Sequence, residues 1–120
     1  MEEKAKTKDL EERTYKFAID VIRIVNLFPQ KTAAYILGKQ IIRSGSSINS
    51  NIIHAKNSLS KKEFTYYLNN AKREAKETKS WLLMIVDADL IGLDKIQSLI
   101  DENEELIKIL VTSVKTSQNK

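Results

Sequence analysis

Apolar residues recur along most of the chain at steps of three and four, the spacing that places them on one face of an α-helix. Four segments show this pattern, and short stretches containing Pro, Gly or Ser separate them. The apolar face of the first segment is formed by Leu10, Phe17, Val21, Ile24 and Phe28. Pro29 disfavours helical backbone at the residue before it, so the first helix should end near Leu27.

The second and third helices meet at a short polar stretch, and each has a recognisable start. Thr32 is a good N-cap residue for the second helix. Ser60 and Glu63 have the spacing of a capping box, so the third helix should start there and run for about 26 residues. The apolar face of the second helix carries Leu37, Ile41, Ile48, Ile52 and Ala55, with Gly45 at its edge. The corresponding face of the third carries Phe64, Leu68, Ala71, Ala75, Thr78, Leu82 and Val86.

A fourth helix follows the turn at Gly92, and Asp94 with Gln97 forms a second, weaker capping pair at its start. Its inward positions are Ile96, Leu99, Asn103, Leu106 and Leu110. Four amphipathic helices with connections of roughly 3 to 6 residues predict an all-α, antiparallel up-down-up-down four-helix bundle. We expect the bundle to span residues 9–115, with a flexible segment at 1–8 and a flexible tail at 116–120.

The second helix also carries a small, polar line beside its apolar face. Ser44 and Gly45 lie where another backbone can approach closely, and Ala71 and Ala75 are small residues at matching positions of the third helix. This pattern predicts a tight crossing of the second and third helices, with the serine hydroxyls and Asn51 hydrogen-bonded locally.

The second and third helices have more apolar residues than one buried face requires. A helix that is apolar on several faces is usually buried on several faces, so the surplus predicts contacts between subunits. Scattered surface hydrophobes are the alternative explanation. The predicted interface residues are Tyr35, Ile42, Ile53, Tyr67, Trp81 and Ile85.

Composition argues against several classes of enzyme. The chain has no cysteine and a single histidine, His54, so thiolate metal sites, His-based metal sites and Ser-His-Asp triads lack their residues. The glycines are isolated and form no phosphate-binding loop. We therefore expect no enzymatic activity, no metal and no cofactor. The first ten residues lack the apolar region of a secretory signal, and no apolar run is long enough to span a bilayer, so we expect a cytoplasmic protein with no membrane association.

Charge is unevenly distributed along a chain whose net charge is +4. No acidic residue occurs between Asp20 and Glu63, whereas residues 87–114 carry seven acids and two lysines. A basic surface of this kind can bind phosphate backbones without reading sequence, can pair with an acidic subunit or partner, or can simply be solvated. The residues predicted to bind nucleic acid are Arg23, Lys39, Arg43, Lys61 and Lys62. Lys72, Arg73, Lys76 and Lys79 form a second basic group, which Glu74 and Glu77 should dilute, the latter by pairing with Arg73.

Three phrases of the sequence resemble one bacterial family. Residues 40–52 fit the pattern Q-[LI]-x-R-S-x-x-S-I-x-x-N-I, and residues 71–82 fit A-x-x-E-A-x-E-T-x-x-W-L. An N-terminal phrase is formed by Leu10, Arg13, Tyr15, Phe17 and Ala18. Together they resemble the four-helix-bundle proteins encoded in intervening sequences of 23S rRNA genes, sometimes labelled ribosomal proteins, over about residues 10 to 110. One departure is His54, which stands where the family usually has Glu.

The resemblance implies a ring-like homopentamer of antiparallel bundles. A related branch contains accessory proteins of diversity-generating retroelements, which bind a reverse transcriptase and nucleic acid through a basic surface. Two functions therefore stay open. The first is a non-catalytic oligomeric protein that binds RNA or other nucleic acid, and the alternative is an oligomeric scaffold whose main partner is another protein, for example a reverse transcriptase.

Overall fold

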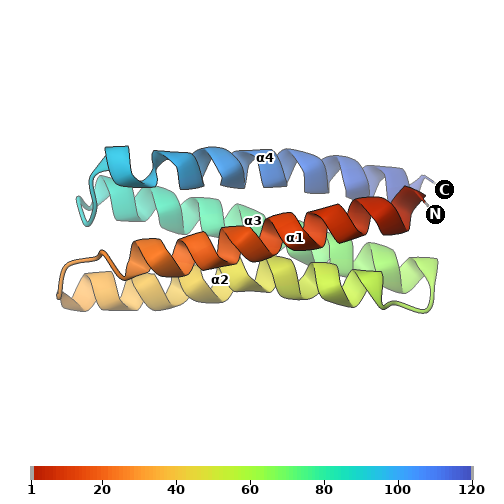
Figure 1. Ribbon diagram of the computed structural model, residues 1–120, viewed down its shortest axis with the longest axis horizontal. Coiled ribbons are helices and arrows are strands. Elements are labelled where there is room, and N and C mark those ends of the chain that lie inside the picture. Colours follow the sequence, from red (N-terminus) through yellow and green to blue (C-terminus); the bar gives the residue numbers. More distant parts are fainter. Residues whose placement is uncertain (1, 120) are drawn as a thin grey trace.

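Helices account for nearly all of residues 2–119, which are the residues that the structure, a computed structural model, describes; side chains are described from Thr7 onward. The helices are α1 (Glu2–Val25), α2 (Thr32–Lys56), α3 (Lys61–Asp87) and α4 (Leu93–Gln118). They run alternately up and down along a bundle of 46 × 20 × 19 Å (Figure 1). The prediction of an all-α, up-down-up-down four-helix bundle is therefore confirmed.

The predicted helix boundaries hold where a side chain caps the helix and shift where none does. The backbone N–H of Glu63 donates to Ser60 Oγ at 3.1 Å, so Ser60 is the N-cap of α3 as predicted. The N-cap of α2 is Lys31 and that of α4 is Gly92, and neither uses a side-chain hydrogen bond. The N-cap role predicted for Thr32 was therefore wrong by one residue.

The turn between α3 and α4 also differs from the prediction. Asp89 adopts a left-handed backbone with φ 57°, and the N–H of Leu90 bonds back to the carbonyl of Ile85. This is the arrangement that usually places glycine after a helix end. The predicted pairing of Asp94 with Gln97 is replaced by a hydrogen bond from Gln97 to Asp101 at 2.9 Å.

The helices extend almost to both ends of the described chain. α1 begins at Glu2 and α4 ends at Gln118, and both Thr7 and Ser117 are buried. The flexibility expected for segments 1–8 and 116–120 stays a prediction, and Met1 and Lys120 lie outside the described residues.

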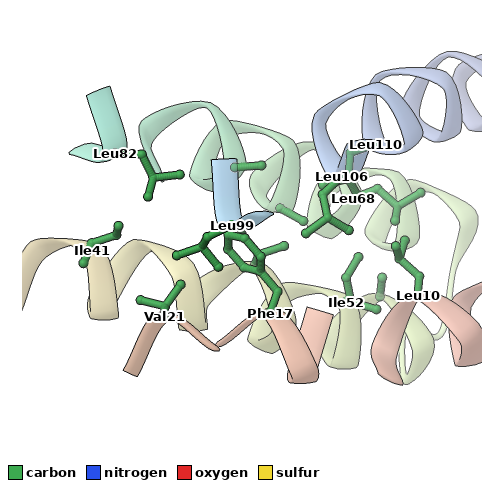
Figure 2. Packing of buried hydrophobic residues seen from close by; sticks show 14 of the residues in the cluster. Leu10, Phe17, Val21, Ile41, Ile52, Leu68, Leu82, Leu99, Leu106 and Leu110 are labelled. Atoms are coloured by element: carbon green, nitrogen blue, oxygen red, sulfur yellow. The ribbon is translucent and has the colours of Figure 1, made fainter. Parts of the chain in front are cut away.

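The inward faces read from the sequence form the core. Each fully buried Leu, Ile or Phe side chain contributes roughly 1.5–3 kcal/mol through removal of apolar surface from water. Figure 2 shows such residues of all four helices converging on one interior: Leu10, Phe17, Val21, Ile41, Ile52, Leu68, Leu82, Leu99, Leu106 and Leu110. Near its C-terminal end α3 turns Ile85 inward, and Ile85 is fully buried whereas Val86 is only half-buried.

The two glycines of α2 face α1 rather than α3. A Cβ on Gly38 would lie 2.9 Å from Val25 Cγ1, and one on Gly45 would lie 3.2 Å from Val21 Cγ2. Ala75 contacts α4, because its carbonyl accepts a hydrogen bond from Asn103 Nδ2 at 3.2 Å. The predicted crossing of α2 and α3 therefore keeps Ser44, whose hydroxyl lies 2.8 Å from that of Thr78, whereas Gly45 faces α1.

The seam between α1 and α4 is the loosest of the four. These two helices make the fewest contacts of any neighbouring pair, and a groove of about 570 Å³ lies between them. Arg13 spans the seam with two bonds to Glu102, Nε to Oε2 at 2.7 Å and Nη2 to Oε1 at 2.8 Å. The hydrogen bonds to Glu102 raise the pKa of Arg13, so its positive charge is held at the seam.

Candidate nucleic-acid interface

The outer face of α3 carries cations over the N-terminal part of the helix. Residues at spacings of three and four from Lys62 point away from the core, on the side opposite the buried Ala71 and Leu82. At 1.5 Å per residue this face extends about 21 Å from Lys62 to Lys76. Its cations are Lys62, Arg73 and Lys76, and Lys61 with the half-buried Lys72 lies along one side of them. We call these five residues the α3 basic face. None of them makes an ion pair with another described residue.

Two of the three acids among and beside these cations, Glu74 and Glu77, are bound by α2, whereas Glu63 is exposed. Arg43 of α2 places Nη1 3.5 Å from Glu74 Oε1, and its Nη2 pairs with Glu77 Oε2. Gln40 Oε1 also accepts a hydrogen bond from Arg43 Nε at 3.3 Å. The predicted pairing of Arg73 with Glu77 was therefore wrong, because α2 supplies the counter-charge to both glutamates. Glu74 and Glu77 therefore do not neutralise the α3 cations, and Glu63 is the acid of this stretch that α2 leaves unpaired among the described residues.

The five residues predicted to bind nucleic acid do not form one patch. Arg23 and Lys39 lie toward the end of the bundle that holds the α1–α2 connection, whereas Lys61 and Lys62 begin α3 at the opposite end (Figure 1). Lys39 is above the Tyr35 ring, 5.4 Å from its centroid, and Arg23 lies 3.9 Å from Asp20. Of the five, only Lys61 and Lys62 belong to the α3 basic face. The sequence pattern identifies Lys72, Arg73 and Lys76 as a second basic group, but they are not among the residues predicted to bind nucleic acid.

The predicted interface residues fall into three groups. Tyr35 and Ile53 are exposed, and Tyr35 is 67% exposed. Ile42, Tyr67 and Trp81 are half-buried and pack against the core. Ile85 was misplaced by the prediction: it is fully buried inside the bundle and has no surface to offer another subunit.

Three aromatic side chains meet where α2 and α3 run side by side. The rings of His54 and Tyr67 stack with centroids 5.0 Å apart and planes at 23°. Tyr66 meets Tyr67 edge-on, with centroids 5.1 Å apart and planes at 76°. His54, the departure from the family pattern, therefore makes an aromatic contact with α3 in place of any contact that an acid would make there.

Two other kinds of feature are absent from the described part of the chain. No group of three or more His, Asp or Glu side chains is gathered as a metal site would require. No helix within residues 2–119 combines the length and the apolar character needed to cross a bilayer.

Comparison with known proteins identifies the family of this chain. Residues 6–112 match the family described as 23S rRNA-intervening sequence protein. The chain belongs to this family. It is also similar to a crystal structure of a protein with unknown function from the S23 ribosomal protein family of Bacteroides thetaiotaomicron VPI-5482. The two chains are 28% identical with a TM-score of 0.84, and the match covers 92% of this chain and 98% of the other. Among curated proteins, none matches this sequence.

In this member of the 23S rRNA-intervening sequence family, the phrases that carried the resemblance hold α2 to α3. Arg43, Glu74 and Glu77 come from those phrases, and Arg43 pairs with both glutamates. Ser44 and Thr78 also come from them and share a buried hydrogen bond. These contacts between motif residues therefore fix how α2 and α3 are rotated about their axes relative to each other. In this orientation the unpaired cations of α3 point outward.

Proposed function

We propose that this protein is a non-catalytic, self-associating bundle that binds RNA in the cytoplasm through the α3 basic face. The observation that carries the proposal is that Lys61, Lys62, Lys72, Arg73 and Lys76 make no ion pair with another described residue, although Glu63, Glu74 and Glu77 stand among or beside them in the sequence. A cation without a protein partner can neutralise a phosphate without first breaking an ion pair.

Binding of this kind is electrostatic and reads little sequence. Each phosphate that is neutralised releases counterions, which gives a slope of roughly −0.7 in log affinity against log salt for a single strand. Repetition of the α3 basic face in every subunit of an oligomer would add avidity to weak single contacts. The family's name, which refers to 23S rRNA, makes structured RNA the first ligand to test.

We expect wild-type protein to bind an RNA hairpin at about 50 mM salt and to lose affinity steeply toward about 200 mM, as measured by fluorescence anisotropy. Arg73→Glu/Lys76→Glu should weaken binding about tenfold or more at the lower salt and flatten the salt dependence, because two phosphate contacts are lost. Lys16→Glu/Lys95→Glu is the matched control. It makes the same change in net charge at two exposed lysines on other helices. Absence of wild-type binding at low salt, or an equal loss in both double variants, would contradict the proposal.

Self-association is supported by apolar residues that the single bundle leaves uncovered. Several lie at the end that holds the α1–α2 and α3–α4 connections (Figure 1). The exposed residues there are Leu27, Tyr35, Ile36, Leu83, Met84 and Leu93. The resemblance supplies five as the number of subunits.

Light scattering of the purified protein at micromolar concentration should give a mass well above the 13.7 kDa of one chain, and close to five times that mass. Tyr35→Ser/Ile53→Ser should shift the mass toward one chain, because both predicted interface residues are exposed in the single bundle. Leu59→Ser, which changes an exposed leucine in the α2–α3 connection, is the control and should leave the mass unchanged. A wild-type mass of 13.7 kDa would rule out self-association under these conditions.

The same apolar end favours one alternative, a scaffold for another protein such as a reverse transcriptase. Large exposed apolar residues gathered at one place are typical of protein contacts. If wild-type protein self-associates but fails to bind RNA, this oligomeric-scaffold alternative replaces the RNA-binding proposal.

A further inference from the structure

Tyr66 occupies an unusual position on the α3 basic face. It is 61% exposed, yet its ring is held edge-on against Tyr67, which is itself half-buried and stacked on His54. The support from Tyr67 restrains the Tyr66 ring, so little conformational entropy remains to be lost when a second flat group packs on it. An aromatic ring that is both exposed and restrained is suited to stacking with a planar ligand.

Cations flank this ring along the helix. Lys62 lies one turn before Tyr66 and Arg73 lies two turns after it, about 6 Å and 10 Å away along the helix axis at 1.5 Å per residue. Both side chains are exposed and neither has an acidic partner among the described residues. A nucleic-acid strand that follows the α3 basic face therefore passes over Tyr66 with cations before and after it, and one exposed acid, Glu63, stands between Lys62 and Tyr66 in the sequence.

Two amides lie in the turn that follows Tyr66. Asn69 and Asn70 are half-buried, and neither side chain makes a hydrogen bond to another described residue. At three and four positions after Tyr66 they share its side of the helix. Their amide groups offer both donors and acceptors to the edge of a planar heterocycle.

We infer that Tyr66 is a stacking site for an unpaired nucleobase of RNA. The inference rests on the proposed function and makes it more specific, because stacking requires a base whose face is free. Bases inside a duplex are already stacked on their neighbours, whereas bases in single strands and loops can be splayed onto aromatic side chains. The α3 basic face therefore binds single-stranded or looped RNA in preference to a continuous duplex.

The test compares a short single-stranded RNA with a blunt duplex in the same anisotropy assay at about 50 mM salt. Tyr66→Leu should weaken single-strand binding about fivefold or more, the range expected for the loss of one stacked base, and should leave duplex binding unchanged. Tyr66→Phe should bind as the wild type does, because the ring is kept. Tyr15→Leu is the matched control, since Tyr15 is 60% exposed on α1 and lies outside the α3 basic face.

Each outcome decides a different claim. An equal loss for both RNAs, or no loss for either, in a Tyr66→Leu variant that melts like wild type would overturn the stacking site. The electrostatic proposal would then still be judged by Arg73→Glu/Lys76→Glu. Failure of the wild type to bind either RNA would overturn the proposed function itself, and a protein-binding role for the exposed Tyr66 would be the reading that remains.

Discussion

Asn103→Asp is expected to lower the free energy of unfolding at neutral pH by about 3 kcal/mol or more. Asn103 is 1% exposed on α4, and its Nδ2 donates to the carbonyl of Ala75 on α3. Aspartate has nearly the same shape but replaces this donor by an acceptor, so a carboxylate oxygen would face a carbonyl oxygen. The Oδ1 atom of Asn103 is already buried without a hydrogen-bond partner in the described structure, so the added charge would find no compensation there.

The loss should depend on pH in a definite direction. Burial favours the neutral acid and raises the pKa of the introduced carboxyl above its unfolded value of about 3.9. The penalty therefore grows as pH rises from the unfolded pKa to the folded one and then levels off. It is smallest below about pH 4, where the neutral acid can again donate to Ala75.

Urea unfolding of wild type and variant at acidic and neutral pH measures this difference. Ser98→Asp is the control, since it adds the same side chain at an exposed position of α4. If Asn103→Asp lowers stability no more than Ser98→Asp does, residue 103 is accessible to water, which contradicts its burial in the structure.

Ala75→Leu is expected to cost about 1–3 kcal/mol of stability through overpacking. Ala75 is fully buried where α3 meets α4, and its carbonyl is in hydrogen-bond contact with Asn103. A leucine side chain at this position would overpack the core around α3 and strain that contact. Thermal unfolding should show a clearly lower midpoint for Ala75→Leu than for Ala33→Leu, which makes the same change at an exposed position of α2. Equal midpoints would show that the core beside Ala75 can accommodate a larger side chain without strain.

The periodicity of apolar residues was enough to predict the fold. Helix formation and burial of one face depend on spacing along the chain, and every predicted inward position of α4, including the polar Asn103, is buried. The pattern was less reliable at the end of α3, where a step of four from Leu82 gives Val86 and a step of three gives Ile85. Both steps fit an ideal helix, and packing against the neighbouring helices selected Ile85.

The candidate site was harder to predict because charge pairing depends on how two helices are rotated against each other. A count along the chain made Arg43 one of the cations free to bind a ligand and made Glu74 and Glu77 a dilution of the α3 cations. The packing of α2 on α3 brings these three residues together, which reverses both interpretations. The distance between Lys39 and Lys61, which is most of a helix length, could not be predicted either, because both residues belong to one acid-free stretch of sequence.

The loose seam between α1 and α4 has a consequence for the order of folding. The other three seams join helices that are consecutive in the chain, so each closes a short loop at small entropic cost. The α1–α4 seam instead joins residues such as Arg13 and Glu102, which are 89 positions apart, and it gains the fewest contacts in return. We therefore expect α1 and α4 to dock last during folding, and this edge to be the first to exchange its amide hydrogens in the native state.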